Sequence, residues 1–142
     1  NLPVLYLSHF MIRDKAEYYA QLQKLRETGN WETWFVYILN GIVETAQNTI
    51  FLITEIKGLI QHYKQRIRSE LPKIYRQELL NNLFNHPYTK IEFVMNDLGV
   101  SRITATKYLE ELVQCDLLHK EKIGRSNYYI NHQLCSLLIL HA

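Results

Sequence analysis

The feature of this sequence that most restricts its fold is a periodic run of apolar residues from Trp31 to Leu71. Apolar side chains recur there at alternating spacings of three and four residues, which is the period of one face of an α-helix. A helix of about forty residues would span about 60 Å, and it could bend at Gly41 or Gly58. Because residues 55–70 are more polar than the first half, we expect them to leave one core and become a connector or a dimer contact.

Two shorter helices are predicted before the long one. Pro3 suits the first turn of a helix that is apolar on most of its surface. Asp14 is a good N-cap for a second helix, with Glu17 three residues later in a capping-box arrangement, and Gly29 would end it. The first half of the long helix should pack on these two. At this spacing a core position is more common than a ligand platform, and the aromatic residues expected in the core are Trp31, Trp34 and Phe35.

A break in the helical pattern is predicted at Pro72, since the residue before a proline is biased away from the helical region. The next helix is predicted from Lys73 to Phe84, and Asn85-His86-Pro87 should end it. A further helix is predicted from Tyr88 to Leu98, and a short apolar helix from Gln133 to Leu140.

The segment after Leu98 has the pattern of a helix-turn-helix. Gly99 lies where a left-handed residue usually ends a helix, and Ser101 is a good N-cap for the next one. The residues of that next helix divide between two faces. Its buried face is predicted to contain Ala105, Leu109 and Leu112. Its outer face is predicted to contain Ile103, Thr106, Lys107 and Glu110, with Arg102 at the edge.

A basic hairpin is predicted directly after this helix. Residues 119–123 should form one strand, residues 124–127 the turn, and residues 128–130 the returning strand. Two helices joined by a short turn and followed by a hairpin have the layout of a winged helix-turn-helix. The predicted fold class is mainly α, a helical region with one long helix followed by a winged helix-turn-helix with a small β-hairpin. The predicted domains are residues 1–71 and 72–142.

Small and basic side chains at the start of the second helix, followed by a hairpin tipped with Lys and Arg, suit a DNA major groove flanked by phosphates. The predicted nucleic-acid-binding residues are Ser101, Arg102, Thr106, Lys107, Lys122, Arg125 and Asn127. Between residues 98 and 131, five positive and four negative side chains leave a net charge of only +1. A module that binds a protein or forms a homodimer, with residues 55–70 and 133–140 as the contact, therefore remains an alternative to DNA binding.

Composition makes several classes of protein improbable. The 142 residues suffice for one domain or two small ones, and the net charge of +2 neither favours nor excludes nucleic acid. The two cysteines form no CxxC pair and the six histidines are scattered, so we predict no disulfide framework and no metal site. No apolar stretch has the length of a membrane span and no signal peptide is recognisable, so we expect a cytoplasmic protein without a membrane partner.

Patterns for catalysis are missing from the sequence. The five glycines are isolated from one another, so no glycine-rich phosphate loop is predicted. No Ser/His/Asp or Cys/His arrangement has a supporting context. We therefore expect this chain alone to be no enzyme, to have no catalytic residues and to hold no cofactor.

Three blocks in roughly the first 46 residues resemble Fic-family proteins. They are the Leu-Pro-x-Leu-Tyr-Leu-Ser run, the paired Tyr18-Tyr19, and an Arg-x-x-Gly-x-Trp-Glu-x-Trp block from Arg26 to Trp34. In that family these blocks follow the catalytic motif. Residues 104–112 and 122–131 are similar to the winged-helix tail that many bacterial members carry. The resemblance thus extends over nearly the whole chain.

The resemblance implies a parent enzyme that transfers AMP from ATP to a hydroxyl side chain of a target protein, usually with Mg²⁺. Members use a histidine base and a phosphate loop within a His-Pro-Phe-x-x-Gly-Asn-Gly-Arg motif. Here His86-Pro87-Tyr88 lies after the Leu-Pro run and no Gly-Asn-Gly-Arg follows it, so we interpret it as a helix terminator. Because Asn1 lies in an apolar run, we expect the chain to be the C-terminal part of a longer protein with its catalytic motif upstream.

Overall fold

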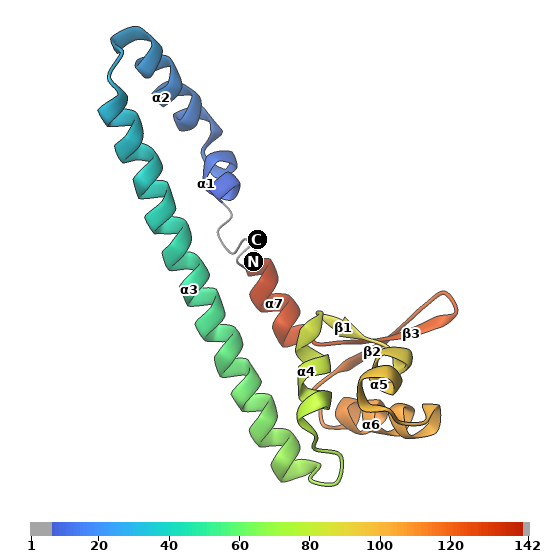
Figure 1. The fold of residues 1–142 in the computed structure, drawn as a ribbon. Helices are drawn as coiled ribbons and strands as arrows, with labels where there is room; N and C mark the ends of the chain where they lie inside the picture. Colours follow the sequence, from blue (N-terminus) through green and yellow to red (C-terminus); the bar gives the residue numbers. More distant parts are fainter. Residues whose placement is uncertain (1–6, 141–142) are drawn as a thin grey trace. The chain divides into compact units, whose positions relative to one another are not determined.

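The computed structural model describes residues 7–140, which divide into two compact units (Figure 1). The first unit extends to Ile53 and the second begins at Thr54. Compactness alone does not define a family domain, so the division into residues 1–71 and 72–142 stays a prediction. The helix start predicted at Pro3 lies outside the described residues.

The long helix predicted from the apolar period is confirmed. Helix α3 runs without interruption from Trp31 to Glu70, a length of 40 residues. Neither Gly41 nor Gly58 ends it. Because the division between the two compact units falls inside this helix, α3 contributes residues to both of them.

Local capping residues set the ends of the short helices in the first unit. These helices are α1, Leu7–Arg13, and α2, Lys15–Thr28. The Asp14 carboxylate accepts a hydrogen bond from Glu17 N over 3.2 Å. Gly29 ends α2 in the left-handed region, with a φ of 65°. Both predicted caps are therefore confirmed, because each depends only on residues within one helical turn.

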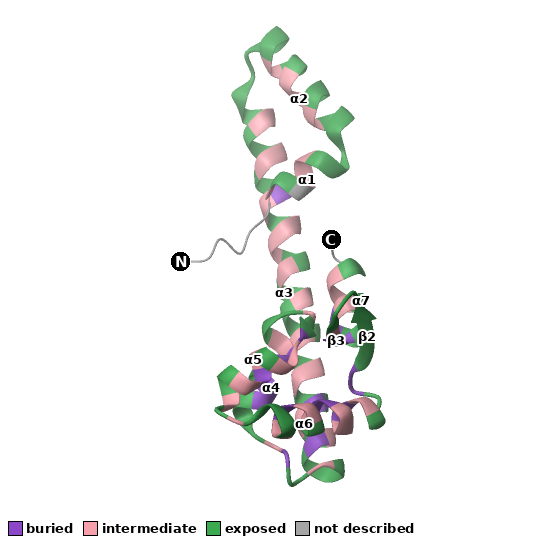
Figure 2. Cartoon of the chain, turned by 90° about the vertical axis from the view of Figure 1, so that its right-hand side faces the viewer, coloured by how far each residue is buried: buried purple, intermediate pink, exposed green. Residues whose placement is uncertain are grey.

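In the first unit α3 is covered on one side and exposed on another. The Phe10 ring packs so closely on Gly41 that a Cβ atom at position 41 would clash with it, so this contact favours a glycine. Trp34 is half-buried, whereas Trp31 and Phe35 are each 60% exposed. The prediction of a core position is wrong for these two residues, because α1 and α2 leave much of α3 exposed, as the green parts of Figure 2 show.

The second unit has the element order of a winged helix-turn-helix. After α3 come α4 (Gln77–Asn85), β1 (Tyr88–Thr89), α5 (Ile91–Leu98), α6 (Arg102–Gln114), β2 (His119–Ile123), β3 (Ser126–Ile130) and α7 (His132–Leu140). The strands form an antiparallel sheet in the order β1–β3–β2, so β3 is central. The predicted fold class is confirmed, and the sheet has one strand more than the predicted hairpin.

Two predicted helix boundaries in this unit are wrong. The helix predicted from Lys73 begins at Gln77, because the chain turns after Pro72 and is still extended at Arg76. The helix predicted from Tyr88 begins at residue 91, because residues 88 and 89 form β1 and pair with residues 130 and 129 of β3.

The core of the second unit lies between its helices and the sheet. Its buried members are Tyr63, Ile67, Ile74, Leu79, Leu80, Leu83, Val94, Ala105, Leu109, Leu112, Leu117, Leu118 and Tyr129. The predicted buried face of α6 is confirmed, since its three residues are fully buried. Tyr63 and Ile67 of α3 are each 1% exposed. Residues 55–70 are thus more than the predicted connector, because their apolar side completes this core and only their outer side is polar.

A buried polar network joins α3 to β3 and α7. Asn131 is 1% exposed, and its Oδ1 accepts hydrogen bonds from the Tyr63 hydroxyl (2.9 Å) and from Leu134 N (3.0 Å). Its Nδ2 donates to the Leu83 carbonyl oxygen over 3.3 Å. The Tyr63 hydroxyl also lies 2.8 Å from the Leu117 carbonyl oxygen. These bonds offset the cost of burying the Asn131 amide and hold the end of β3 against α3.

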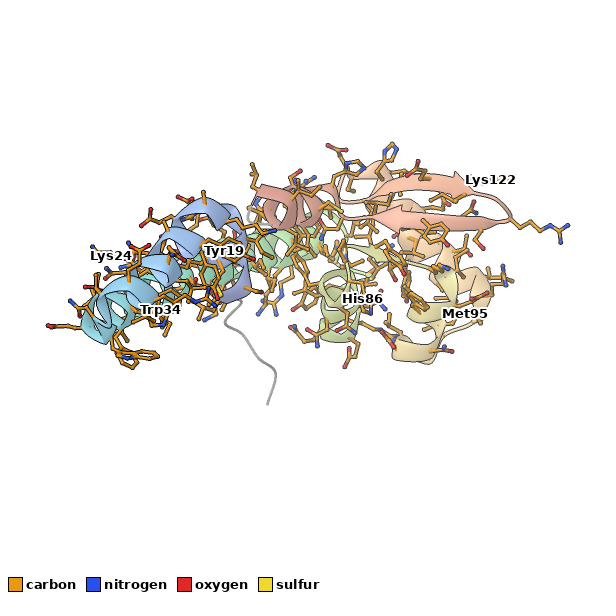
Figure 3. All side chains as sticks on the ribbon, turned by 90° about the horizontal axis from the view of Figure 1, so that it is seen from above. Tyr19, Lys24, Trp34, His86, Met95 and Lys122 are labelled. Atoms are coloured by element: carbon orange, nitrogen blue, oxygen red, sulfur yellow. The ribbon has the colours of Figure 1, made fainter. Side chains whose placement is uncertain are left out.

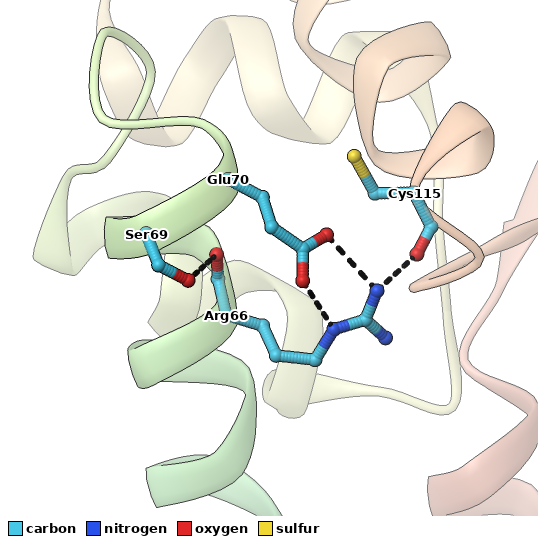
Figure 4. Close-up of polar contacts among 4 residues, drawn as sticks. All are labelled: Arg66, Ser69, Glu70 and Cys115. Carbon is cyan, nitrogen blue, oxygen red and sulfur yellow. Dashed lines mark hydrogen bonds and ion pairs between the residues drawn. The ribbon is translucent and has the colours of Figure 1, made fainter.

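A second polar contact joins the end of α3 to the end of α6 (Figure 4). The Arg66 guanidinium donates two hydrogen bonds to the Glu70 carboxylate, of 2.8 and 3.0 Å, and one of 2.6 Å to the Cys115 carbonyl oxygen. Cys115 is half-buried against the core, and burial raises the pKa of its thiol. Arg66 thus satisfies a carbonyl group at the C-terminus of α6 that has no partner within its own helix.

Candidate nucleic-acid interface

Two local residues define the turn between α5 and α6. Gly99 ends α5 in the left-handed region, with a φ of 63°. The Ser101 hydroxyl accepts a hydrogen bond from Thr104 N over 3.3 Å, so the predicted N-cap of α6 is confirmed. The Thr104 hydroxyl also lies 3.0 Å from Ser101 Oγ. The Ser101 side chain therefore stabilises the start of the helix that would enter a groove.

The first two turns of α6 present three kinds of side chain to solvent. Arg102 is exposed, and Ile103 is 84% exposed. The Lys107 side chain is 71% exposed and its Nζ lies 3.8 Å from the carboxylate of Glu111, one turn later. The Thr106 hydroxyl donates to the Arg102 carbonyl oxygen over 2.8 Å. Of the residues predicted to bind nucleic acid, Arg102 is exposed and in no ion pair among the described residues, Lys107 is exposed but paired with Glu111, and Thr106 is partly engaged with its own helix.

The wing is a hairpin of β2 and β3 with a two-residue turn, Gly124–Arg125. Gly124 has a φ of 62°, and this is the position at which a tight hairpin turn often requires glycine. Residues 126 and 127, predicted as part of the turn, already belong to β3. Lys122, labelled in Figure 3, pairs with Asn127 across the hairpin. Lys122 and Arg125 are both exposed. The three predicted wing residues therefore lie at or beside the hairpin tip.

A carboxylate on α6 fixes the position of the wing. Glu110 Oε1 accepts hydrogen bonds from Lys120 Nζ on β2 (2.6 Å) and from the Tyr129 hydroxyl on β3 (2.9 Å). The bond from Lys120 lowers the pKa of Glu110, whereas burial and the bond to Glu110 raise the pKa of Tyr129. Because strand residues two apart share a face, Lys122 lies on the same side of the hairpin as Lys120 and faces towards α6.

Sequence reasoning did not identify this contact of Glu110, Lys120 and Tyr129. The length of the hairpin turn could have indicated this contact, because a two-residue turn places Lys120 opposite Tyr129 in the hairpin register. The four-residue turn assumed from the sequence shifts this register and hides the pair.

Two of the four acidic side chains between residues 98 and 131 are paired within the module. Glu110 is paired with Lys120, and Glu111 with Lys107. Among the described residues, Arg102, Lys122 and Arg125 take part in no ion pair. Pairing removes two cations and two acids alike, so the net charge of residues 98–131 stays +1. The three cations without an ion pair lie at the helix start and near the wing tip, whereas Asp116 follows α6 and Glu121 lies on β2.

Other kinds of site are not supported in residues 7–140. No group of three His, Cys, Asp or Glu side chains is arranged to hold a metal ion in the part of the chain that the structure describes. None of the helices described there is long and apolar enough to cross a membrane. A cavity of about 200 Å³ lies beside His86 and Asp97, which is small for a nucleotide. His86 follows the last residue of α4, as expected of a helix terminator.

These elements define a winged helix-turn-helix protein in which the end of a long helix completes the core. Residues 59–134 match the family described as "Protein adenylyltransferase SoFic-like, C-terminal domain". The match covers more than half of the chain, so the chain belongs to this family of Fic C-terminal domains. The predicted resemblance to the winged-helix tail of Fic proteins is confirmed.

Proposed function

We propose that this chain is the regulatory C-terminal part of a protein adenylyltransferase and that its winged helix binds duplex DNA. The observation that carries the DNA proposal is the distribution of charge. Glu110 and Glu111 are paired with Lys120 and Lys107. Of the remaining charges between residues 98 and 131, three are cations, Arg102, Lys122 and Arg125, and two are acids, Asp116 and Glu121, none of them in an ion pair among the described residues. These three cations lie at the helix start and the wing, the two parts of such a module that approach DNA.

Each predicted residue has a role in this proposal. Arg102, Thr106 and Lys107 approach bases or phosphates from α6, and Ser101 caps that helix. Lys122, Arg125 and Asn127 approach the backbone from the wing. Lys107 exchanges its contact with Glu111 for a phosphate, and the cost is small because exposed ion pairs of this kind contribute about 0.3–0.5 kcal/mol.

AMP transfer belongs in this proposal to a catalytic region outside these residues. The family's description as a protein adenylyltransferase supports transfer of AMP to a protein by the parent. The use of ATP and Mg²⁺ and a hydroxyl group as the target are implied by the resemblance of the sequence to Fic proteins. A DNA-binding tail would place that activity at a chromosomal site or make it respond to DNA. A DNA-stimulated or DNA-inhibited transfer of AMP by a protein that carries both parts would support this regulatory role.

Fluorescence anisotropy with duplex DNA at increasing salt tests the DNA proposal. Lys107→Ala should weaken binding, and Arg125→Ala should reduce the slope of log K against log[salt] by about one unit if Arg125 contacts one phosphate. The matched control is Lys24→Ala, because Lys24 is an exposed lysine of α2 (Figure 3). Isotherms and slopes identical to wild type for both test variants would contradict the proposal.

A second candidate function is homodimerisation through α7. Ile139 and Leu140 on this helix are 76% and 78% exposed, which is unusual for two adjacent large apolar residues. Light scattering of the chain and of Ile139→Glu tests this candidate. A dimer that the substitution dissociates, together with no DNA affinity at low salt, would favour an interaction module. Both functions can coexist, since helix-turn-helix proteins often bind DNA as dimers.

A further inference from the structure

One highly exposed side chain on the outer face of α6 is apolar. Ile103 is 84% exposed, the highest value among the large apolar side chains that the structure describes. It is the second residue of α6 and so lies in the first turn, the part of a recognition helix that reaches base edges. Arg102 and Lys107, both exposed, flank it on this face.

The hydroxyl groups around Ile103 are directed to their own helix. Ser101 Oγ accepts from Thr104 N, and the Thr104 hydroxyl lies 3.0 Å from Ser101 Oγ. The Thr106 hydroxyl donates to the Arg102 carbonyl oxygen over 2.8 Å. The first turn therefore presents the branched sec-butyl group of Ile103 between two cations, with its hydroxyls already hydrogen-bonded.

We propose that Ile103 recognises thymine in the major groove by packing on its C5-methyl group. This proposal rests on the proposed binding of duplex DNA. Thymine is the only base that presents a methyl group in the major groove, and apolar side chains distinguish it by contact with that group. The flanking cations Arg102 and Lys107 favour a polyanion over an apolar protein surface as the partner of this face.

Replacement of thymine by uracil tests the proposal, because uracil lacks only the C5-methyl group and keeps the same hydrogen-bonding edge. The wild-type chain first selects its preferred duplex from a random library. Each thymine of that duplex is then replaced in turn by uracil, and the affinities are compared for wild type and for Ile103→Ala. The matched control is Ile12→Ala, since Ile12 is also highly exposed, at 69%, but lies on α1.

At the thymine that Ile103 contacts, we expect replacement by uracil to weaken wild-type binding roughly fourfold, because the burial of one methyl group contributes about that factor to an affinity. Ile103→Ala should lose a similar factor with thymine and should be insensitive to uracil at that position, whereas Ile12→Ala should behave as wild type. Equal uracil penalties in wild type and Ile103→Ala, or no penalty in wild type, would overturn the thymine contact and leave DNA binding intact. No binding of any duplex at low salt would overturn both proposals. A loss of self-association in Ile103→Ala with unchanged DNA affinity would assign Ile103 to a protein contact instead.

Discussion

The hydroxyl group of Tyr63 has one proton but lies near two acceptors, Asn131 Oδ1 at 2.9 Å and the Leu117 carbonyl oxygen at 2.8 Å. It can therefore donate to only one of them at a time. The Asn131 amide cannot reverse to solve this, because its Oδ1 faces Leu134 N and its Nδ2 faces the Leu83 carbonyl oxygen. Asn131 Oδ1 keeps its bond from Leu134 N in either case, so the Leu117 carbonyl oxygen is the acceptor that depends on Tyr63, in a site that is almost inaccessible to water.

Tyr63→Phe should lower the free energy of unfolding by about 1–3 kcal/mol, because a buried acceptor then loses its donor. The matched control is Tyr75→Phe, whose hydroxyl is exposed and makes only a 3.3 Å contact with Gln77. This control should change stability by less than about 0.5 kcal/mol. Urea denaturation measures both values, and equal effects of the two substitutions would contradict the importance of the buried hydroxyl.

Alkaline pH should destabilise the folded chain through its buried tyrosines. Burial raises the pKa of Tyr63 from 10.0 to about 12, and the pKa of Tyr129 is raised as well. Folding thus favours the protonated hydroxyl groups, and their contribution is complete below pH 10.0 and is lost as the pH rises through the folded-state values.

The unfolding free energy of wild type should therefore decrease above pH 10, as measured by urea denaturation at a series of pH values. The double variant Tyr63→Phe/Tyr129→Phe should show a flatter profile in that range, although it is less stable at neutral pH. Parallel profiles for wild type and the variant would assign the alkaline transition to other groups.

At the scale of elements, the Glu110 contact determines how the wing sits against α6. One carboxylate oxygen accepts bonds from both strands of the hairpin, so it restrains the hairpin as a unit. The hydrogen bond with Lys120 lowers the pKa of Glu110 from its ordinary 4.5. Its contribution to stability is therefore present above that pH and is lost as the pH falls through the lower, folded-state pKa.

Glu110→Ala should lower the unfolding free energy by about 1–2 kcal/mol, because the buried Tyr129 hydroxyl loses its acceptor. It should also weaken the proposed DNA binding, since the wing is no longer held against α6. Glu110→Gln keeps an acceptor for Tyr129 and should cost less than half as much. The control is Glu121→Ala on the opposite face of β2. Denaturation and anisotropy measure the two effects, and a stronger effect in Glu121→Ala would refute this assignment.

Elements were predictable from the sequence where their limits depend on neighbouring residues. Asp14, Gly99 and Ser101 act within one helical turn, so the corresponding helix ends follow from capping chemistry. Strand β1 has only two residues and pairs with residues forty positions away in the chain, so it leaves no periodic signal. The bond between Tyr63 and Asn131 joins residues 68 positions apart and is equally invisible to local patterns.

For the candidate site, the sequence predicted which cations are near the helix start and the hairpin but not how the acids are paired. Lys107 and Glu111 are four residues apart on one helix, and this pair could have been derived from helical spacing. The pairing of Glu110 with Lys120 depends on the hairpin register and on the packing of the sheet against α6. The prediction of DNA contact by the seven named residues stays untested.

At the scale of the whole molecule, the core of the winged helix does not begin at α4 but includes the end of α3. Tyr63 and Ile67 of α3 are core residues, and the family match also begins before them, at residue 59. The second compact unit includes both of these residues, whereas a domain that began at residue 72 would lack them.

A chain of residues 54–142 should therefore unfold cooperatively, with near-native helix content. A chain of residues 72–142 should be less stable by at least about 4 kcal/mol, because it loses two fully buried side chains together with the Tyr63 hydroxyl. Circular dichroism and urea denaturation of the two chains compare them directly. Equal stability would place the boundary at residue 71, where the sequence predicts it.

The network around Asn131 also has an evolutionary consequence. Its amide joins α3, α4, β3 and α7 at a point where neither a smaller nor an apolar side chain could satisfy the same groups. A related chain without a hydroxyl group at position 63 would bury a carbonyl group that has no hydrogen-bond donor at the centre of the module. Substitutions at positions 63 and 131 should therefore occur together across related chains, while the exposed residues of α6 diverge with whatever sequences those chains bind.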